Sequence, residues 1–175
     1  MSQRVKPVAV ITRLESYEPQ SIGRAVAIYL RVGTPLPAFD GATCWFNGEP
    51  AIPPDTSAVL VHFWAVSCPA CKVNLPDLRR LQIIYREHGL YVVAVHSPRS
   101  EADTDTEVVA RAVAELGITE PCAVDNTHTI GERFQTVGLW PYYYLFAGDG
   151  LTLRRHAAGG AGVRLIERVL ARIFP

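Results

Sequence analysis

The sequence predicts an α/β fold, in which a central mixed β-sheet carries helices on both faces and an N-terminal extension precedes it. Two observations lead to this class. Between residues 58 and 173, short apolar runs typical of buried strands alternate with longer stretches whose apolar residues recur near a 3.6-residue period. The resulting order, β-α-β-α-β-α-β-β-α, ends in a predicted hairpin followed by a helix, so both parallel and antiparallel strands are expected in one sheet.

The first half of this order is built around two buried strands. Ala58–Trp64 (AVLVHFW) and Leu90–Val95 (LYVVAV) are near-continuous apolar runs, as expected of strands that are covered on both faces. Between them, the stretch from Pro69 to about Glu87 is predicted to be helical, because its leucines recur near the helical period. Upstream, Thr43–Phe46 is predicted to be a short strand that enters a turn.

The second half contains shorter elements. The pattern predicts a helix over Thr106–Leu116, a short strand near Cys122–Val124, a short helix near Ile130–Phe134, a hairpin formed by Tyr142–Ala147 and Leu151–His156, and an amphipathic helix from Val163 to Ile173. The GDG turn at 148–150 joins the two strands of the hairpin. Residues 1–32 are predicted to be an extension of ambiguous secondary structure, and residues 33–175 form the main domain.

Composition and charge exclude several classes of function. The 175 residues are 49% apolar and 19% charged, which fits a compact domain, and 17 basic residues balance 17 acidic ones. A neutral chain gives no electrostatic reason to bind nucleic acid or an anionic membrane surface. No run is long enough to span a bilayer, and the apolar run Val8–Ile11 is too short for a secretory signal. We therefore expect a cytoplasmic protein, or an exported one if a leader has been removed.

The four cysteines provide the strongest chemical signal. Cys68 and Cys71 form a C-x-x-C pair where a buried strand has ended and a helix begins, with Pro69 at the first helical position. Unpaired N–H groups at a helix N-terminus stabilise a thiolate, which makes Cys68 the expected nucleophile. Cys71 lies one turn further on the same face and can resolve a mixed disulfide. These residues predict thiol–disulfide exchange.

Two other interpretations of the pair are weaker. A C-x-x-C can be half of a zinc site, but no second C-x-x-C or H-x₃₋₅-H accompanies it, so no metal is expected. Two unreactive buried cysteines would not need the strand–loop–helix context. Cys44 and Cys122 are expected to be small buried apolar residues rather than redox partners.

Several motifs in order resemble those of a known family. They are WFNG at 45–48, FWAVSCPAC at 63–71, VAVHSPR at 93–99, GITEPCAVDN at 117–126 and LWPYYYLF at 139–146. With them the chain, from about Gly33 to its end, resembles the thioredoxin superfamily and its TlpA/ResA-like branch. Within that branch it is most similar to the thioredoxin-like domain of DipZ-type and of NHL-repeat-containing proteins.

This resemblance implies a thioredoxin fold over residues 33–175 and a thiol–disulfide oxidoreductase activity. The expected substrates are protein thiols and disulfides, with a redox partner protein, and the cysteines alone carry the electrons without a bound cofactor. The Trp140-Pro141 step matches the family's cis-proline loop, which pairs with an extended substrate segment; an ordinary trans turn is the alternative. The residues expected to contact or shield the substrate site are Trp64, Pro69, Ala70, Trp140 and Pro141.

Two positions depart from the family pattern. Thioredoxins often carry a buried acid six residues before the first cysteine, and this chain has His62 there. Its imidazole can act as a base or favour a thiolate, or His62 can be a buried, hydrogen-bonded strand residue. Many relatives carry a Glu three residues after the second cysteine, where this chain has Asn74, whose amide cannot titrate.

Two other functions remain as alternatives. One is a non-catalytic binding or adaptor module, supported by residues 1–32, through which two copies of the chain can form a homodimer. The other is a thiol peroxidase, although that chemistry usually needs a lone cysteine in a Pro/Thr-rich loop, which is not found here.

Overall fold

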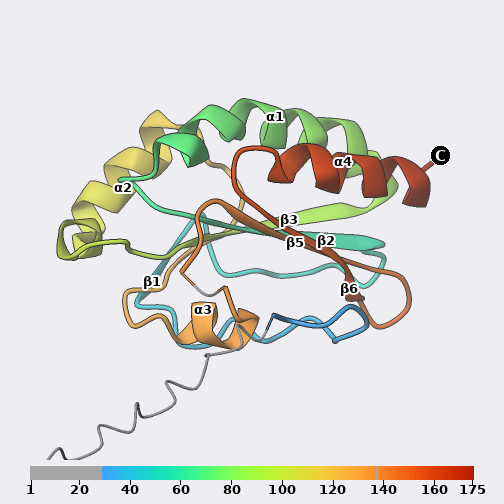
Figure 1. The fold of residues 1–175 in the computed structure, drawn as a ribbon, viewed down its shortest axis with the longest axis horizontal. Coiled ribbons are helices and arrows are strands. Elements are labelled where there is room, and N and C mark those ends of the chain that lie inside the picture. Colours follow the sequence, from blue (N-terminus) through green and yellow to red (C-terminus); the bar gives the residue numbers. More distant parts are fainter. Residues whose placement is uncertain (1–28, 137) are drawn as a thin grey trace, which may run out of the picture.

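One six-stranded sheet organises the protein, as seen in a computed structural model that describes residues 29–136 and 138–175. The strand order is β1-β4-β3-β2-β5-β6. Helices cover both faces of this sheet (Figure 1). Along the chain the elements are β1 (Cys44–Phe46), β2 (Ala58–Trp64), α1 (Pro69–Tyr85), β3 (Leu90–His96), α2 (Thr106–Glu115), β4 (Cys122–Val124), α3 (Thr129–Phe134), β5 (Tyr142–Ala147), β6 (Thr152–Ala158) and α4 (Gly162–Ile173).

Strand β2 lies at the centre of the sheet. It pairs in parallel with β3 and antiparallel with β5, and all of its residues are buried. Strand β4 runs parallel to β3 and antiparallel to β1, and β6 closes the other edge antiparallel to β5. The predicted mixed sheet and the predicted order of elements are therefore confirmed.

The two faces of the sheet have separate cores. Helices α1, α2 and α4 pack on one face, where Leu81, Val109 and Leu170 are buried together. On the other face α3 contributes Phe134, which contacts Phe63 and other aromatic rings of the sheet edge-to-face. Burial of apolar surface on both faces fixes the register of the strands between them.

Helix α1 has sequence-encoded ends. Cys68 is its N-cap and Pro69 its first residue, where a missing N–H costs no hydrogen bond. It ends at Tyr85, a little before the predicted boundary, and a short 3-10 helix over Arg86–His88 follows. Gly89 then takes a left-handed conformation with φ of 86°, which a glycine adopts without steric cost.

Strand β6 differs most from its predicted bounds. Leu151 has a φ of 45°, so it belongs to the turn after Gly150, and the strand begins at Thr152. It continues to Ala158 instead of ending at His156. A positive φ at a leucine carries no signal in the sequence, which explains the one-residue error at the start.

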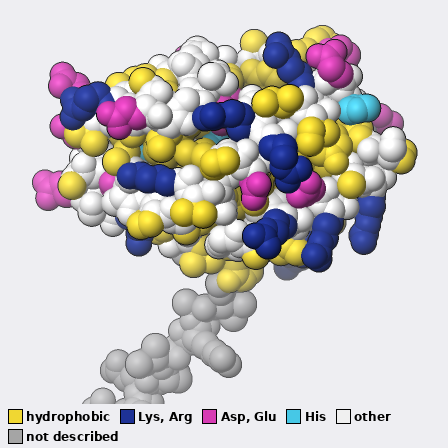
Figure 2. All heavy atoms as spheres, turned by 90° about the horizontal axis from the view of Figure 1, so that it is seen from above, with side chains coloured by type: hydrophobic (Ala, Val, Ile, Leu, Met, Phe, Trp, Pro, Cys, Tyr) yellow, Lys and Arg dark blue, Asp and Glu magenta, His cyan; other side chains and the backbone are white. Residues whose placement is uncertain are grey.

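The last helix packs closely against the dithiol-bearing helix. Arg80 on α1 forms two hydrogen bonds with the carboxylate of Glu167 on α4, at 2.8 and 3.0 Å. A side chain at Gly162 would place its Cβ 2.6 Å from a ring carbon of Tyr143, so a glycine is required there. Over the face that carries these helices, basic side chains are scattered among apolar and acidic ones (Figure 2).

The extension lies almost entirely outside the described residues. The division at residue 33 and the homodimer through residues 1–32 therefore stay predictions. Of the residues near that boundary, Leu30 is buried against the core of the α3 face. Within the described part of the chain, no helix combines the length and the apolar character needed to cross a bilayer.

Candidate active site

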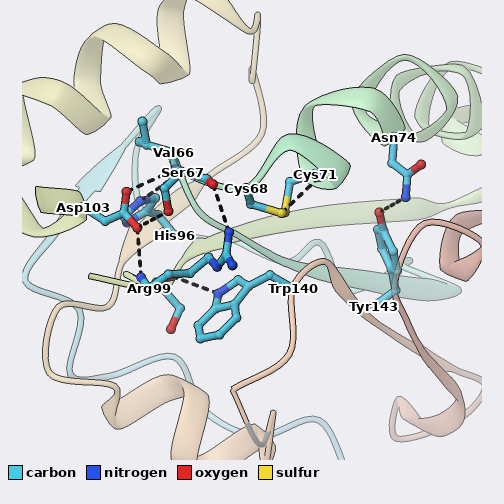
Figure 3. Close-up of a disulfide and its surroundings, with 11 residues drawn as sticks. Val66, Ser67, Cys68, Cys71, Asn74, His96, Arg99, Asp103, Trp140 and Tyr143 are labelled. Atoms are coloured by element: carbon cyan, nitrogen blue, oxygen red, sulfur yellow. Dashed lines mark hydrogen bonds between the residues drawn. A yellow bond between two sulfur atoms is a disulfide. The ribbon is translucent and has the colours of Figure 1, made fainter. Parts of the chain in front are cut away.

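Cys68 and Cys71 form a disulfide at the start of α1, with their Cα atoms 5.3 Å apart (Figure 3). The backbone N–H of Cys71 donates a hydrogen bond to Sγ of Cys68 at 3.1 Å. This is the N-cap position, where helix N–H groups lack partners within the helix. Both cysteines are only 3% exposed. The geometry is that of an oxidised dithiol with a backbone donor directed at its first sulfur.

A buried carboxylate holds the loop in front of Cys68. Asp103 accepts hydrogen bonds from the backbone N–H of Ser67 at 3.1 Å, from the Ser67 hydroxyl at 2.6 Å and from the backbone N–H of Arg99 at 2.9 Å. Burial raises the pKa of Asp103, but the hydrogen bonds from Ser67 and Arg99 outweigh burial and hold the pKa below its usual value. Asp103 is therefore ionised and ties the dithiol loop to the segment after β3.

His96 also holds the loop that precedes Cys68, through a hydrogen bond to Val66. Its Nε2 accepts a hydrogen bond from the backbone N–H of Val66 at 3.3 Å, and its ring lies edge-on to Trp64 with centroids 5.0 Å apart. Burial lowers the pKa of His96 to about 4, so the ring is neutral near pH 7. A neutral ring is what the contact requires, because the nitrogen that accepts from Val66 cannot carry a proton.

The Trp140–Pro141 peptide bond is cis, and its loop lies beside the dithiol loop. The indole N–H of Trp140 donates to the carbonyl oxygen of Ser97 at 2.9 Å. The Arg99 guanidinium lies 5.8 Å from the centroid of the Trp140 ring and donates to the carbonyl oxygen of Ser67 at 2.9 Å. The structure thus brings together two segments that are more than 70 residues apart in the sequence.

His62 lies on β2 and forms a buried pair with a carboxylate that the sequence analysis did not single out. Its Nε2 is 2.7 Å from Oε1 of Glu120, and both side chains are almost fully buried. Asn47 fixes the segment of Glu120 by donating to the carbonyl oxygens of Ile118 and Glu120, at 2.9 Å each. Burial raises the pKa of Glu120, but hydrogen bonds, above all the one with His62, outweigh burial and hold this pKa below its usual value.

Known proteins are similar to this chain in sequence and in fold. The thiol–disulfide oxidoreductase YkuV of Bacillus subtilis is 35% identical over 147 residues, which are 83% of this chain and 97% of that protein. This chain belongs to the thioredoxin superfamily. It is a member of the TlpA/ResA-like branch and a thiol–disulfide oxidoreductase of thioredoxin type.

Two further comparisons agree with this membership. The solution structure of a thioredoxin-like protein in its oxidised form has a TM-score of 0.71 and 35% identity, and covers 82% of this chain and 97% of that one. The predicted thioredoxin fold is thereby confirmed. Protein DipZ of Mycobacterium tuberculosis is 31% identical over 141 residues, 78% of this chain but only 20% of that protein. No protein-family model matches the chain.

The residues expected to contact substrate lie at different depths in this thioredoxin-like protein. Pro69 and Ala70 are exposed at the start of α1, and Trp140 is half-buried. Pro141 is buried, and Trp64 is 1% exposed behind the dithiol loop. The exposed rim is therefore formed by Pro69, Ala70 and Trp140, with Trp64 packed beneath it.

Asn74 is engaged inside the protein. Its side-chain amide is buried and donates to the hydroxyl of Tyr143 at 3.1 Å. Burial raises the pKa of Tyr143 to about 12, so this hydroxyl stays protonated at physiological pH. The bond links α1 to β5 one turn beyond Cys71. Where relatives often carry a titrating glutamate, this chain has a structural contact.

Three polar residues of the candidate site were missed by the sequence analysis: Arg99, Asp103 and Glu120. Arg99 and Glu120 fall inside the motifs VAVHSPR and GITEPCAVDN, so the resemblance marked their segments but not the residues. Asp103 lies outside both motifs, in a short 3-10 helix over Glu101–Thr104. Its importance depends on a contact with Ser67, 36 positions earlier, that no local pattern reveals.

Proposed function

We propose that Cys68 is the nucleophile and Cys71 the resolving thiol in disulfide exchange with protein substrates. The Cys68 thiolate attacks a substrate disulfide, so that one substrate sulfur leaves and a mixed disulfide forms. The Cys71 thiolate then attacks Sγ of Cys68, which releases the second substrate sulfur as a thiol. Two electrons pass from the protein to the substrate, and the Cys68–Cys71 disulfide is the product. The reverse sequence oxidises a substrate dithiol.

The observation that carries this proposal is the contact between the Cys71 N–H and Sγ of Cys68 at the N-terminus of α1. In the reduced protein the same N–H and the helix dipole stabilise negative charge on Cys68. Cys71 begins its attack one turn away, so resolution needs little movement.

The rim around the dithiol supports a protein substrate. Pro69, Ala70 and Trp140 present apolar surface and backbone groups to an extended segment. Because each turnover leaves the pair oxidised or reduced, a second dithiol–disulfide protein must restore it. The redox partner is therefore part of the proposal, as is a folded catalytic domain over residues 33–175 that follows an extension. A cytoplasmic location remains a prediction.

We assign proton transfer at Cys71 to His62, with Glu120 as its positioning residue. His62 lies on the sheet beneath α1, because it shares its side of β2 with Leu60 and Trp64, which pack in the α1 core. Glu120 reaches it from the segment before β4. The ionised Glu120 accepts the proton-bearing Nε2 of His62, which leaves Nδ1 as the proton acceptor of the ring.

Reduction of insulin disulfides tests the assignment of the cysteines. Cys68→Ser should lower the rate by on the order of 10³-fold or more, because the remaining thiols lack the helix N-cap position that activates Cys68. Cys71→Ser should accumulate the mixed disulfide with substrate, visible by mass spectrometry. Cys122→Ala is the control and should keep activity, because Cys122 is fully buried on β4, which β3 separates from β2, the strand that leads into Cys68. Retained activity in Cys68→Ser would contradict the proposal, and peroxide consumption that depends on Cys68 would favour the thiol peroxidase alternative.

A further inference from the structure

Arg99 reaches across the rim of the dithiol site. Its guanidinium donates to the carbonyl oxygen of Ser67, the residue before Cys68, and lies over the ring of Trp140, the residue before Pro141. Figure 3 shows the side chain between these two segments. Any extended substrate that approaches Cys68 alongside Trp140 therefore passes close to this positive charge.

Among the described residues, no carboxylate neutralises the guanidinium of Arg99, in contrast to those of Arg80 and Arg133. Arg80 makes two bonds to the carboxylate of Glu167, and Arg133 makes two to that of Asp40. Among residues 29–136 and 138–175, the guanidinium of Arg99 has neither an ion pair nor a second hydrogen bond. A guanidinium has five N–H donors, so most of those of Arg99 face solvent at the site.

The side chain is nevertheless held in place. Asp103 accepts the backbone N–H of Arg99, which fixes the start of the side chain, and the Ser67 carbonyl fixes its end. The ring of Trp140 supports the guanidinium on one side. A cation held at both ends loses little conformational freedom on binding an anion, which favours recognition over simple solvation.

We propose that Arg99 is a substrate-recognition residue that binds the carboxylate of an acidic side chain next to the reacting cysteine of a protein substrate. This inference rests on the proposed function and adds its substrate class, extended segments in which Asp or Glu flanks the cysteine. The planar guanidinium matches a carboxylate in shape and charge and can donate two parallel hydrogen bonds.

Peptides that carry a single cysteine as a mixed disulfide with 2-thiopyridine provide the test. The Cys68 thiolate of the reduced protein attacks the peptide sulfur, and 2-thiopyridone leaves with one proton and absorbs light. Cys71 then attacks Cys68 and releases the peptide thiol, so one dithiol is oxidised for each disulfide reduced. The peptides have blocked termini and differ only in the residues that flank the cysteine: Glu, Gln or Lys.

The full-length protein should react fastest with the Glu peptide. At low salt we expect a second-order rate constant about fivefold above that of the Gln peptide and higher still relative to the Lys peptide, with the ratio shrinking in 0.5 M salt. Arg99→Gln should bring the Glu-to-Gln ratio close to one, and Arg99→Glu should invert the order in favour of Lys. Arg111→Gln, on the exposed side of α2, is the matched control and should keep the wild-type ratio.

The ratio separates recognition from other roles of Arg99. Loss of a positive charge can also raise the pKa of Cys68, but that effect slows all peptides equally and leaves their ratio unchanged. Equal rates in the wild type, or an unchanged ratio in Arg99→Gln, would overturn this inference and leave the proposed function intact. Absence of reaction with every peptide would overturn both. If the variants fail to fold by circular dichroism, the wild-type ratio and its salt dependence decide the question.

Discussion

The four cysteines occupy two contrasting regions of the protein. Cys68 and Cys71 lie at the N-terminus of α1, whereas Cys44 and Cys122 lie on the paired strands β1 and β4. Exposure does not separate the two regions, because Cys71 is 3% exposed and Cys122 is fully buried. Hydrogen-bond donors separate them: at the helix start a free N–H points at sulfur, while in the sheet the N–H groups are used by the ladder.

The comparison shows that the reactivity of each thiol depends on the backbone N–H groups around its sulfur, not on its exposure. Burial raises the pKa of the Cys122 thiol to about 12 and also raises the pKa of Cys44. At the start of α1, equally deep burial is offset by helix N–H groups and by the dipole. Two positions with the same exposure can therefore differ by orders of magnitude in thiolate content.

Alkylation of the reduced protein should give the largest difference between the two regions. A rise in the pKa of Cys122 from 9 to about 12 lowers its thiolate fraction at pH 7 by about 10³-fold. We expect iodoacetamide to modify Cys68 first and to leave Cys122 unmodified, as measured by peptide mass spectrometry. In denaturant the rates should converge. Modification of Cys122 in the native protein at a rate similar to that of Cys68 would break the comparison.

His96 joins the two regions, because it pairs with Trp64 on β2 and with Val124 on β4 and also holds the dithiol loop. The pKa of the His96 ring, about 4, lies below the usual 6.5. Between pH 4 and pH 6.5 the unfolded chain therefore binds a proton at this ring that the folded chain does not bind. Stability should be complete above pH 6.5 and fall as the pH decreases. At pH 5 the loss relative to mildly alkaline pH reaches about 2 kcal/mol, measurable by urea unfolding.

A variant isolates the contribution of His96. His156, whose pKa is also lowered by burial, contributes in the same pH window in the wild type and in His96→Gln. The carboxylates with lowered pKa, Asp103 and Glu120, lose their contribution only at lower pH. We expect a clearly smaller pH slope in His96→Gln than in the wild type. Identical slopes would show that the ring is not the group that titrates.

Loss of the hydrogen bond between Asn74 and Tyr143 should have the smallest effect on stability. Tyr143→Phe removes the acceptor and leaves the buried amide of Asn74 without its partner, which should cost about 1 kcal/mol of stability. Tyr144→Phe is the matched control: its hydroxyl is buried and has no partner among the described residues, so its removal should be neutral or stabilising. Equal losses in both variants would assign the effect to ring packing instead. Urea unfolding measures both.

The helices and strands could be predicted because each is encoded by a pattern of neighbouring residues. Pattern alone placed Tyr142–Ala147 at its observed bounds and located the start of α1 at Pro69. The dithiol could be assigned because strand, loop and helix follow one another directly around Cys68. The sheet class then followed from the order of the elements.

The polar contacts around the dithiol could not be predicted, because they join segments distant in the chain. His62 and Glu120 are 58 positions apart, and Ser67 and Asp103 are 36 apart. Before folding, Glu120 is indistinguishable from an exposed acid. Only the tertiary structure brings such side chains together and gives them partners.

The central position of β2 also has a consequence for the nascent chain during synthesis. This central strand leads into Cys68, but one of its neighbours is β5 near the end of the chain, and the last helix covers α1 through Glu167 and Arg80. On the ribosome the two thiols therefore emerge long before the residues that enclose them. During that interval all four cysteines are open to oxidants and to wrong pairings. Docking of α4 against α1, rather than emergence of the C-x-x-C motif, completes the packing of the helix that carries the two cysteines.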